Sequence, residues 1–263
     1  MPELPEVEAV VRKLRIAAPW GVVASCGQYR PTTMNKAELA IGHRIEAVER
    51  RGKNILVGLS GGAFLRVHLK MTGNCLVLPD VRLRAATVRA WFGLEDGRGL
   101  VLDDPRALGR ISFHEESERA ELFAALGPEP DDAAFTAAHL TAAARQTVKP
   151  IKLLLMEQKA VVGLGNIYAA EALFQAGIDP KKPSSRISGP KLRALHGAIV
   201  EVLRIALDSA VAAYEQPGGF AEGENFPVAV YGREGEPCFR CQSVIRRIPQ
   251  GGRSTYYCPR CQK

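Results

Sequence analysis

The chain has 263 residues, of which 46% are hydrophobic, and this length allows one large domain or two with real cores. It has no apolar run near the ~18 residues of a membrane span, and acidic residues interrupt its N-terminal segment, which argues against a secretion signal. The net charge is +7, and residues 238–263 carry six basic residues and no acidic one. This basic segment suggests a polyanionic partner, although a solvated tail would have the same charge.

The first predicted element is a helix that starts near Pro5. Apolar residues follow at helical spacing, and proline is favoured in the first turn of a helix. Pro2 and Glu3 would then lie at the positive end of the helix dipole, which favours carboxylates at Glu3 and Glu6. Removal of Met1 would make Pro2 a terminal secondary amine, which can form an iminium with a sugar aldehyde. An ordinary helix start with acidic residues fits the same pattern.

Short alternating segments follow, after a predicted loop over 19–35 and a helical turn over 36–40. Hairpin turns separate them, so they indicate a β-sandwich or barrel. Lys53 lies at a glycine-flanked corner, and His68 and Met71 lie near the end of another strand; a surface or core role is the default for each. The predicted strands are 43–50, 54–59, 63–69, 75–78, 87–94 and 100–103.

Beyond the strands, the turn 104–109 presents Arg106 and Leu108, and a Gly-Pro-rich linker covers 127–130. Helices are predicted at 132–137, 140–145, 151–158, 167–176 and 189–214. The apolar connection 159–166 contains two glycines and ends in Asn166, which is expected to be the N-cap of the next helix. Such a connection can approach a phosphate closely or form a tight helical corner. The loop from Gln216 to Pro227 could close over a ligand.

Four cysteines near the C-terminus have the spacing of a zinc site, with disulfides as the alternative. They are Cys238, Cys241, Cys258 and Cys261. Four thiolates leave no open position for water, so the predicted zinc ion is structural. Between the cysteine pairs, 245–248 and 255–257 are predicted to form a hairpin, with 249–252 as its turn and Arg253 just past the tip.

Taken together, three stretches resemble the formamidopyrimidine-DNA glycosylase and endonuclease VIII family of bacterial repair enzymes. The start MPELPEVE resembles the formamidopyrimidine branch, VVGLGNIYAAEALFQAGIDP resembles the family's helix-two-turn-helix, and VYGREGEPCFRC with GGRSTYYCPRCQ resembles its zinc finger. The resemblance implies an α+β multidomain fold. Its parts would be an N-terminal β-sandwich with a leading helix (1–126), a helical domain (131–216), a loop and linker (217–232) and a zinc finger (233–263).

The resemblance also assigns roles to residues. Pro2 would attack the anomeric sugar carbon, Glu3 would move protons as general acid and base, Glu6 would support the site, and Lys53 would contact a phosphate and assist elimination. Further DNA contacts would come from His68, Lys152, Asn166 and Arg253. Met71, Arg106 and Leu108 would fill the space of an everted base. The partner would be double-stranded DNA with damaged bases or abasic sites, bound by a monomer in the bacterial cytoplasm, on the nucleoid.

Two features depart from the family pattern. Leu108 stands where the family usually has phenylalanine, and the 216–227 loop differs from the segment that usually covers oxidised guanine. The sequence therefore leaves open which base is removed: an oxidised or ring-opened purine, an oxidised pyrimidine, or none at an abasic site. Two other classes stay open, a protein that binds damaged DNA without cutting it and a zinc-ribbon adaptor for nucleic acid.

Overall fold

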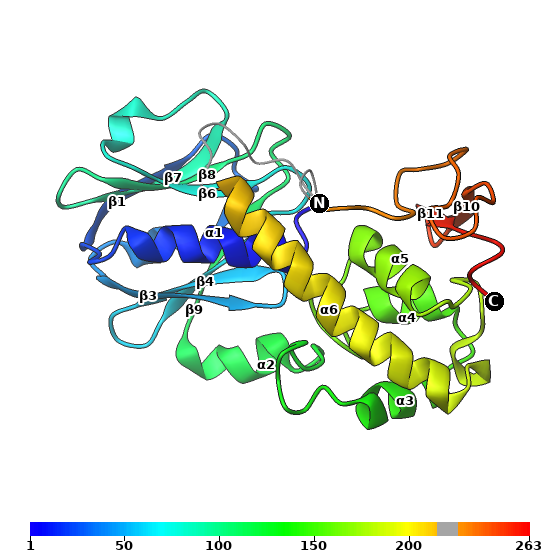
Figure 1. Ribbon diagram of the computed structural model, residues 1–263. Coiled ribbons are helices and arrows are strands. Elements are labelled where there is room, and N and C mark those ends of the chain that lie inside the picture. The colour runs from blue at the N-terminus through cyan, green and yellow to red at the C-terminus, as the bar shows by residue number, and fades with distance from the viewer. Residues whose placement is uncertain (215–225) are drawn as a thin grey trace. The chain divides into compact units, whose positions relative to one another are not determined.

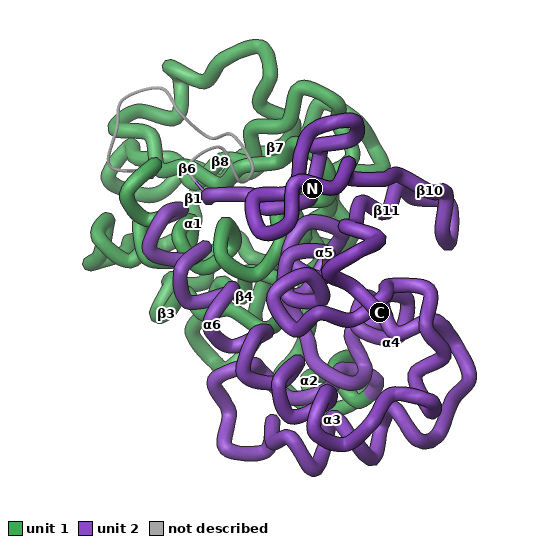
Figure 2. Tube along the Cα trace, turned by 45° about the vertical axis from the view of Figure 1, so that its right-hand side comes forward, with its two compact units in different colours: residues 1–124, 211–222 green, residues 125–210, 223–263 purple. Residues whose placement is uncertain are grey.

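This computed structural model describes residues 1–214 and 226–263; the part of the predicted 216–227 loop before residue 226 lies outside the described residues. The chain divides into two compact units, one formed by residues 1–124 with 211–222 and the other by 125–210 with 223–263 (Figure 2). No helix in the described part of the chain is both long and apolar enough to cross a membrane.

The first unit is a β-sandwich with a helix between its sheets. Helix α1 (Leu4–Ile16) runs between the two sheets and contacts strands of both (Figure 1). Val7, Val10, Val11 and Leu14 are almost fully buried, as their helical spacing predicts. One sheet has the strand order β1-β7-β8-β6 and the other β2-β9-β5-β4-β3. The predicted fold class is thus confirmed for this unit.

The remaining elements of this unit are short. The strands are β1 (Val23–Gln28), β2 (Met34–Asn35), β3 (Ile45–Arg51), β4 (Asn54–Leu59), β5 (Phe64–His68), β6 (Asn74–Leu78), β7 (Val88–Leu94), β8 (Gly99–Asp103) and β9 (Arg110–His114). Helix α2 (Arg119–Phe123) and the 3-10 turns η1 (Ala37–Ala40), η2 (Val81–Leu83) and η3 (Glu116–Glu118) complete the unit.

Three strands of the sandwich were not predicted from the sequence. The loop expected over 19–35 contains β1 and β2, and β9 follows the turn at 104–109. Strand β1 lacks regular alternation and contains Gly27, whose missing side chain makes room for Trp91 of β7. A Cβ atom at Gly27 would lie 2.8 Å from the Trp91 ring. The formation of β1 therefore depends on its pairing with β7, which is distant in sequence.

The helical part of the second unit has a single apolar core, in which Leu140, Leu155, Tyr168 and Leu195 are fully buried. Its helices are α3 (Ala137–Arg145), α4 (Ile151–Met156), α5 (Asn166–Gln175) and α6 (Gly189–Tyr214, of which 211–214 belong to the first unit), with a 3-10 turn η4 (Ser184–Arg186). The prediction for α6 is confirmed, whereas the helix expected at 132–137 is wrong. The Asp132 carboxylate accepts the main-chain N–H of Ala134 and holds a turn there.

The C-terminal segment of this unit is a two-stranded hairpin beside the cysteines. Strands β10 (Arg246–Gln250) and β11 (Arg253–Tyr257) pair antiparallel, and Gly251 and Gly252 form the turn with φ angles of 57° and 73°. Two consecutive left-handed residues make the tightest hairpin connection, so Pro249 and Gln250 belong to the strand. The turn predicted at 249–252 is therefore two residues too long.

Candidate functional site

The start of α1 places two carboxylates at the N-terminus of a helix. Glu3 is the N-cap: its carboxylate accepts the main-chain N–H of Glu6, while the Glu6 carboxylate accepts the main-chain N–H of Glu3 at 2.8 Å. Both side chains are nearly inaccessible, at 1% and 3% exposure. A reciprocal capping box fixes both carboxylates relative to the backbone. Pro2, which precedes Glu3, is also buried.

Lys53, in the turn before β4, lies close to His68 at the end of the neighbouring strand β5. Gly52, with a φ angle of 56°, turns the chain between β3 and β4, and the following Lys53 is 8% exposed. His68 pairs in the sheet with Asn54, the residue after Lys53. Burial and the positive charges of Lys70, Arg66 and Lys53 lower the pKa of His68 from 6.5 to about 4. Near neutral pH the cluster therefore presents cations beside a neutral imidazole, an environment that favours an anion.

The three predicted wedge residues lie on two loops. Met71 is 40% exposed on the loop between β5 and β6, and Arg106 is exposed on the loop between β8 and β9, where Leu108 is half-buried. Buried Asp104 receives hydrogen bonds from both loops. Sequence reasoning missed Asp104, although aspartate at the start of a turn is a recognised signal.

In the second unit, Lys152 of α4 is buried among polar groups. Its ammonium group donates to Asn166 Oδ1 at 2.6 Å, Thr255 Oγ1 at 2.8 Å and the Ser254 carbonyl at 3.3 Å. Its exposure is 1%. Lys152 therefore holds Asn166 of α5 and residues 254–255 of β11 together. Its direct contact with a flipped base or a phosphate stays a prediction.

Asn166 is not the N-cap of α5, as the sequence predicted, because Gly165 occupies that position. Its side chain instead accepts from Lys152 and donates to the Ser254 carbonyl at 3.0 Å. The hydroxyl of Tyr231 lies 3.5 Å from the Asn166 amide nitrogen. Asn166 is therefore held where the first turn of α5 meets the hairpin.

Glu171 and Tyr231 are two members of this region that sequence reasoning missed. The buried Glu171 carboxylate accepts the main-chain N–H groups of Ala229, Val230 and Tyr231 at 2.8, 3.0 and 2.8 Å. Burial raises the pKa of Glu171 despite these donors. Glu171 thus fixes the segment that carries Tyr231, and a glutamate within an apolar helix is the signal that could have revealed it.

The four cysteines form one cluster, with all sulfur atoms within 4.8 Å of one another. Cys238 and Cys261 are 3.9 Å apart, and Cys241 and Cys258 are 3.4 Å apart. A tetrahedral Zn–thiolate site with ~2.3 Å bonds separates its sulfurs by about 3.8 Å, so the cluster fits zinc. The surrounding core contains Ala170 and Phe174 of α5, which connects the cluster to the helical part. The exposed Arg253 begins β11, directly after the hairpin turn.

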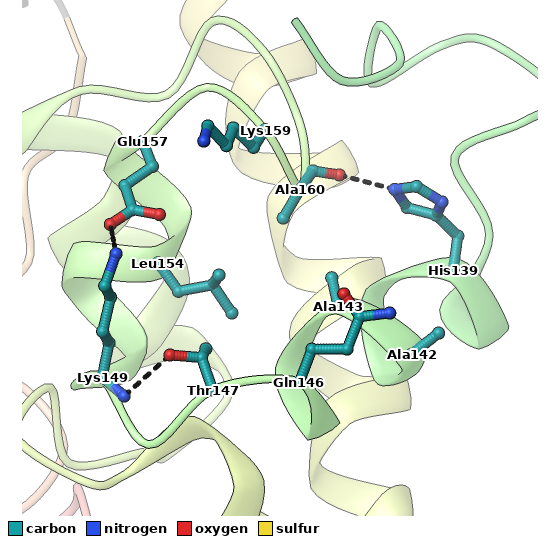
Figure 3. Close-up of a pocket in the computed structure, with 10 residues that line it drawn as sticks. All are labelled: His139, Ala142, Ala143, Gln146, Thr147, Lys149, Leu154, Glu157, Lys159 and Ala160. Carbon is teal, nitrogen blue, oxygen red and sulfur yellow. Dashed lines mark hydrogen bonds and ion pairs between the residues drawn. The ribbon is translucent and has the colours of Figure 1, made fainter. Parts of the chain in front are cut away.

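A pocket of about 490 Å³ lies elsewhere in the second unit, between α3, α4 and the following loop (Figure 3). Several of its polar groups are paired: the Lys149 ammonium donates to Glu157 at 2.5 Å, and a His139 ring nitrogen lies 2.9 Å from the Ala160 carbonyl. None of the predicted site residues lines it. The candidate residues of the second unit therefore lie outside this pocket.

Known proteins match this chain over its whole length. The family models that match are the formamidopyrimidine-DNA glycosylase N-terminal domain (residues 1–111), the H2TH domain (126–215) and a zinc finger found in FPG and IleRS (235–263). The formamidopyrimidine-DNA glycosylase of Chloroflexus aggregans is 39% identical over 275 residues, with 100% of this chain and 98% of the relative covered.

Two solved structures are similar throughout. MutM in complex with DNA containing carbocyclic 8-oxo-G has a TM-score of 0.90 and 30% identity, with both chains fully covered. Lactococcus lactis Fpg in complex with DNA containing FAPY-dG has a TM-score of 0.89 and 29% identity, covering 99% of this chain and 100% of the other. Together with the matched zinc finger, the four clustered cysteines identify one structural zinc site in this chain.

Proposed function

Because the chain belongs to the formamidopyrimidine-DNA glycosylase family, we propose that it is a DNA glycosylase and abasic-site lyase of base excision repair. Its substrate is double-stranded DNA with an oxidised or ring-opened purine, or with an abasic site. The single observation that carries the proposal is the Glu3–Glu6 capping box immediately after Pro2.

The chemistry follows from the start of the chain. After removal of Met1, the Pro2 nitrogen forms a bond to the anomeric carbon of the damaged nucleotide as the bond from that carbon to the base breaks; the base leaves with a proton from water, and the nitrogen loses its own proton. The ring oxygen then leaves the anomeric carbon and takes up a proton, which gives an open-chain iminium. Loss of a proton from the adjacent carbon expels the 3′ phosphate, and a second elimination expels the 5′ phosphate. The iminium withdraws electrons in both eliminations.

Glu3 and Glu6 have different tasks in this scheme. Glu3 is adjacent to the nucleophile. Its carboxylate takes up the proton that the Pro2 nitrogen loses and passes it to the ring oxygen, and it removes a proton during elimination. Glu6 holds the Glu3 main chain through a 2.8 Å hydrogen bond, so it orients the carboxylate without touching the substrate. The helix dipole favours the ionised form of both groups at this position.

Lys53 and His68 provide a phosphate site beside the chemistry. The His68 imidazole is neutral and therefore adds no charge to the site, while the positive charges of Lys70, Arg66 and Lys53 attract a phosphate. We propose that Lys53 contacts the phosphate next to the lesion and that His68 donates a hydrogen bond to it.

The exposed wedge residues fill the space left by the everted nucleotide. Eversion costs a few kcal/mol of unstacking, and side chains inserted into the stack offset part of this cost. Met71 and Leu108 provide the apolar surface, and the Arg106 guanidinium faces the acceptor groups of the orphaned base. Leu108 is smaller than the phenylalanine that the family usually has at this position, so insertion depends more on Met71 and Arg106.

In the second unit, Asn166 and Arg253 bind backbone phosphate, and buried Lys152 and the zinc-bound hairpin set their positions. Phosphate contacts fix the register of a protein on a duplex without reading its sequence. We propose that residues 1–126 carry out the chemistry, that 131–216 and 233–263 hold the DNA, and that 217–232 joins them. The enzyme acts as a monomer on the nucleoid, in the bacterial cytoplasm.

The test is borohydride trapping with protein whose loss of Met1 has been verified by intact mass. The duplexes carry an abasic site, a formamidopyrimidine, 8-oxoguanine, an oxidised pyrimidine or no lesion. We expect a covalent adduct that maps to Pro2, with the highest yields on abasic and ring-opened purine duplexes. A Pro2→Leu variant, in which the larger residue keeps Met1 in place, gives no adduct, whereas Pro5→Ala, in the first turn of α1, still gives one.

A protein that binds these duplexes but forms no adduct on any of them would overturn the proposal. The chain would then be a damaged-DNA-binding protein of the same fold that does not cut. Binding and cleavage by wild type and Pro2→Leu separate the two alternatives further. A glycosylase loses cleavage and keeps binding when the amine is blocked, whereas a protein that only binds damaged DNA loses nothing.

A further inference from the structure

One buried carboxylate joins the two loops that carry the wedge residues. Asp104 is fully inaccessible, and its Oδ1 atom accepts the Thr72 hydroxyl at 2.5 Å and the Arg106 main-chain N–H at 3.2 Å. Its Oδ2 atom accepts the N–H groups of Leu108 and Gly109 at 2.6 and 2.7 Å. Thr72 is the neighbour of Met71 in the other loop, so one side chain binds both loops.

The backbone of both loops is closely fitted around this carboxylate. A Cβ atom at Gly109 would lie 2.9 Å from the Leu102 side chain and 3.3 Å from Asp104 Oδ2. A Cβ atom at Gly73 would lie 2.5 Å from the Leu69 carbonyl oxygen. Glycine is therefore required at Gly73, where the obstacle is backbone, whereas a side chain at Gly109 would have to displace the end of the Leu102 side chain. Ala107 has a φ angle of 54°, a strained left-handed conformation that the hydrogen bonds of Asp104 hold in place.

Arg89 supports the same loop from the neighbouring strand. Its guanidinium donates to the carbonyl of Asp104 at 2.7 Å and to that of Pro105 at 3.1 Å. Burial raises the pKa of Asp104, but the hydrogen bonds from Thr72, Gly109, Leu108 and Arg106 outweigh this effect and leave the pKa below its usual value. The group therefore remains an ionised acceptor, the form that this set of donors requires.

We propose that Asp104 is a positioning residue that, through Thr72, joins Met71, Arg106 and Leu108 into one preorganised wedge. This inference rests on the proposed function. Two loops that are ordered before DNA binds lose less conformational freedom on insertion than two independent loops. The hydrogen bond between Thr72 and Asp104 matters most where a stacked, paired base must be displaced, and least where the base is already absent.

The experiment compares single-turnover rates on two substrates that differ only in this respect. One is a duplex with a ring-opened purine paired to cytosine, and the other is the same duplex with a preformed abasic site. Thr72→Val removes the hydrogen bond between the loops and leaves the three main-chain donors to Asp104 in place. We expect base excision to slow by about tenfold, the scale of losing one hydrogen bond to a charged acceptor, while abasic cleavage changes by less than about twofold.

Thr72→Ser keeps the hydroxyl group and is the matched control, with both rates expected near wild type. Asp104→Asn should act in the same direction as Thr72→Val and more strongly, because the amide places a donor against donors. A 2-aminopurine next to the lesion reports eversion directly, and its slow fluorescence rise should be delayed in Thr72→Val.

Equal slowing on both substrates, or no slowing of base excision by a folded Thr72→Val protein, would overturn the inference. So would unchanged eversion kinetics. Each of these outcomes leaves the proposed function intact, because wild-type activity on the two substrates is measured in the same experiment. Absence of wild-type cleavage on the abasic duplex would instead contradict the proposed function.

Discussion

The Lys152 ammonium group lies 2.6 Å from the Asn166 side-chain oxygen and is almost completely withdrawn from solvent. It also donates to Thr255, so one cation links α4, α5 and β11. Replacing Lys152 by methionine leaves these acceptors buried without their donor, at a cost of about 1–3 kcal/mol for each. We expect a lower melting temperature and weaker binding to a duplex with an abasic-site analogue, because Asn166 loses its fixed orientation.

The salt dependence of binding shows whether Lys152 positions other groups or touches phosphate. A positioning role leaves the slope of log K against log salt unchanged, since no phosphate contact is lost. Lys149→Met is the matched control, because Lys149 is an exposed lysine of the same unit in an ion pair with Glu157 and should matter little. A slope that falls by about one in Lys152→Met would show direct phosphate contact instead.

Arg253 should behave in the opposite way. Its side chain is exposed, directly after the turn of Gly251 and Gly252. Arg253→Ala should therefore weaken binding to all duplexes to a similar degree and lower the salt slope by about one, without a loss of thermal stability. Arg260→Ala removes the same charge from an exposed position beside the cysteine cluster and should change the slope less. Equal effects of the two variants would mean that the basic segment acts only through its total charge.

The contrast between Lys152 and Arg253 shows how far the sequence alone can lead. The start of α1 and the four cysteines were predicted correctly because each depends on residues close together in the chain. The burial of Lys152 depends on Thr255, which is 103 positions away, and no local pattern reveals that contact. For Asp104 the local pattern indicates a turn, but its contact with Thr72 on another loop is not visible in the sequence.

The zinc site should be required for DNA binding but not for the fold of the first unit. Cys258 is fully buried in a small core with Phe174, Val230 and Ile245. Structural zinc contributes about 10–16 kcal/mol to the folding of isolated zinc-finger peptides, so this core should open without the ion. Elemental analysis should give one zinc per chain, and Cys258→Ser should lose both the metal and the binding of abasic-analogue duplexes.

Cys26→Ser is the control for the zinc experiment, because Cys26 is a half-exposed thiol of β1, outside the cluster. This variant should keep one zinc per chain and normal binding. A Cys258→Ser protein that still binds the duplex with wild-type affinity would show that the hairpin does not depend on the metal.

His68 should make the stability of the protein depend on pH in mildly acidic solution. Burial first, and then the charges of Lys70, Arg66 and Lys53, hold its pKa at about 4, against 6.5 for an ordinary histidine. Between these values the unfolded chain binds a proton that the folded chain does not, so the free energy of unfolding falls as the pH falls from about 6.5 to 4. One such group contributes at most about 1.4 kcal/mol per pH unit. Urea denaturation of wild type and His68→Gln should therefore show a smaller loss in the variant across this range, and NMR titration of the His68 ring should give the low pKa directly. Parallel stability curves for the two proteins, or a ring that titrates near 6.5, would show that neither burial nor the surrounding cations lower the pKa of His68.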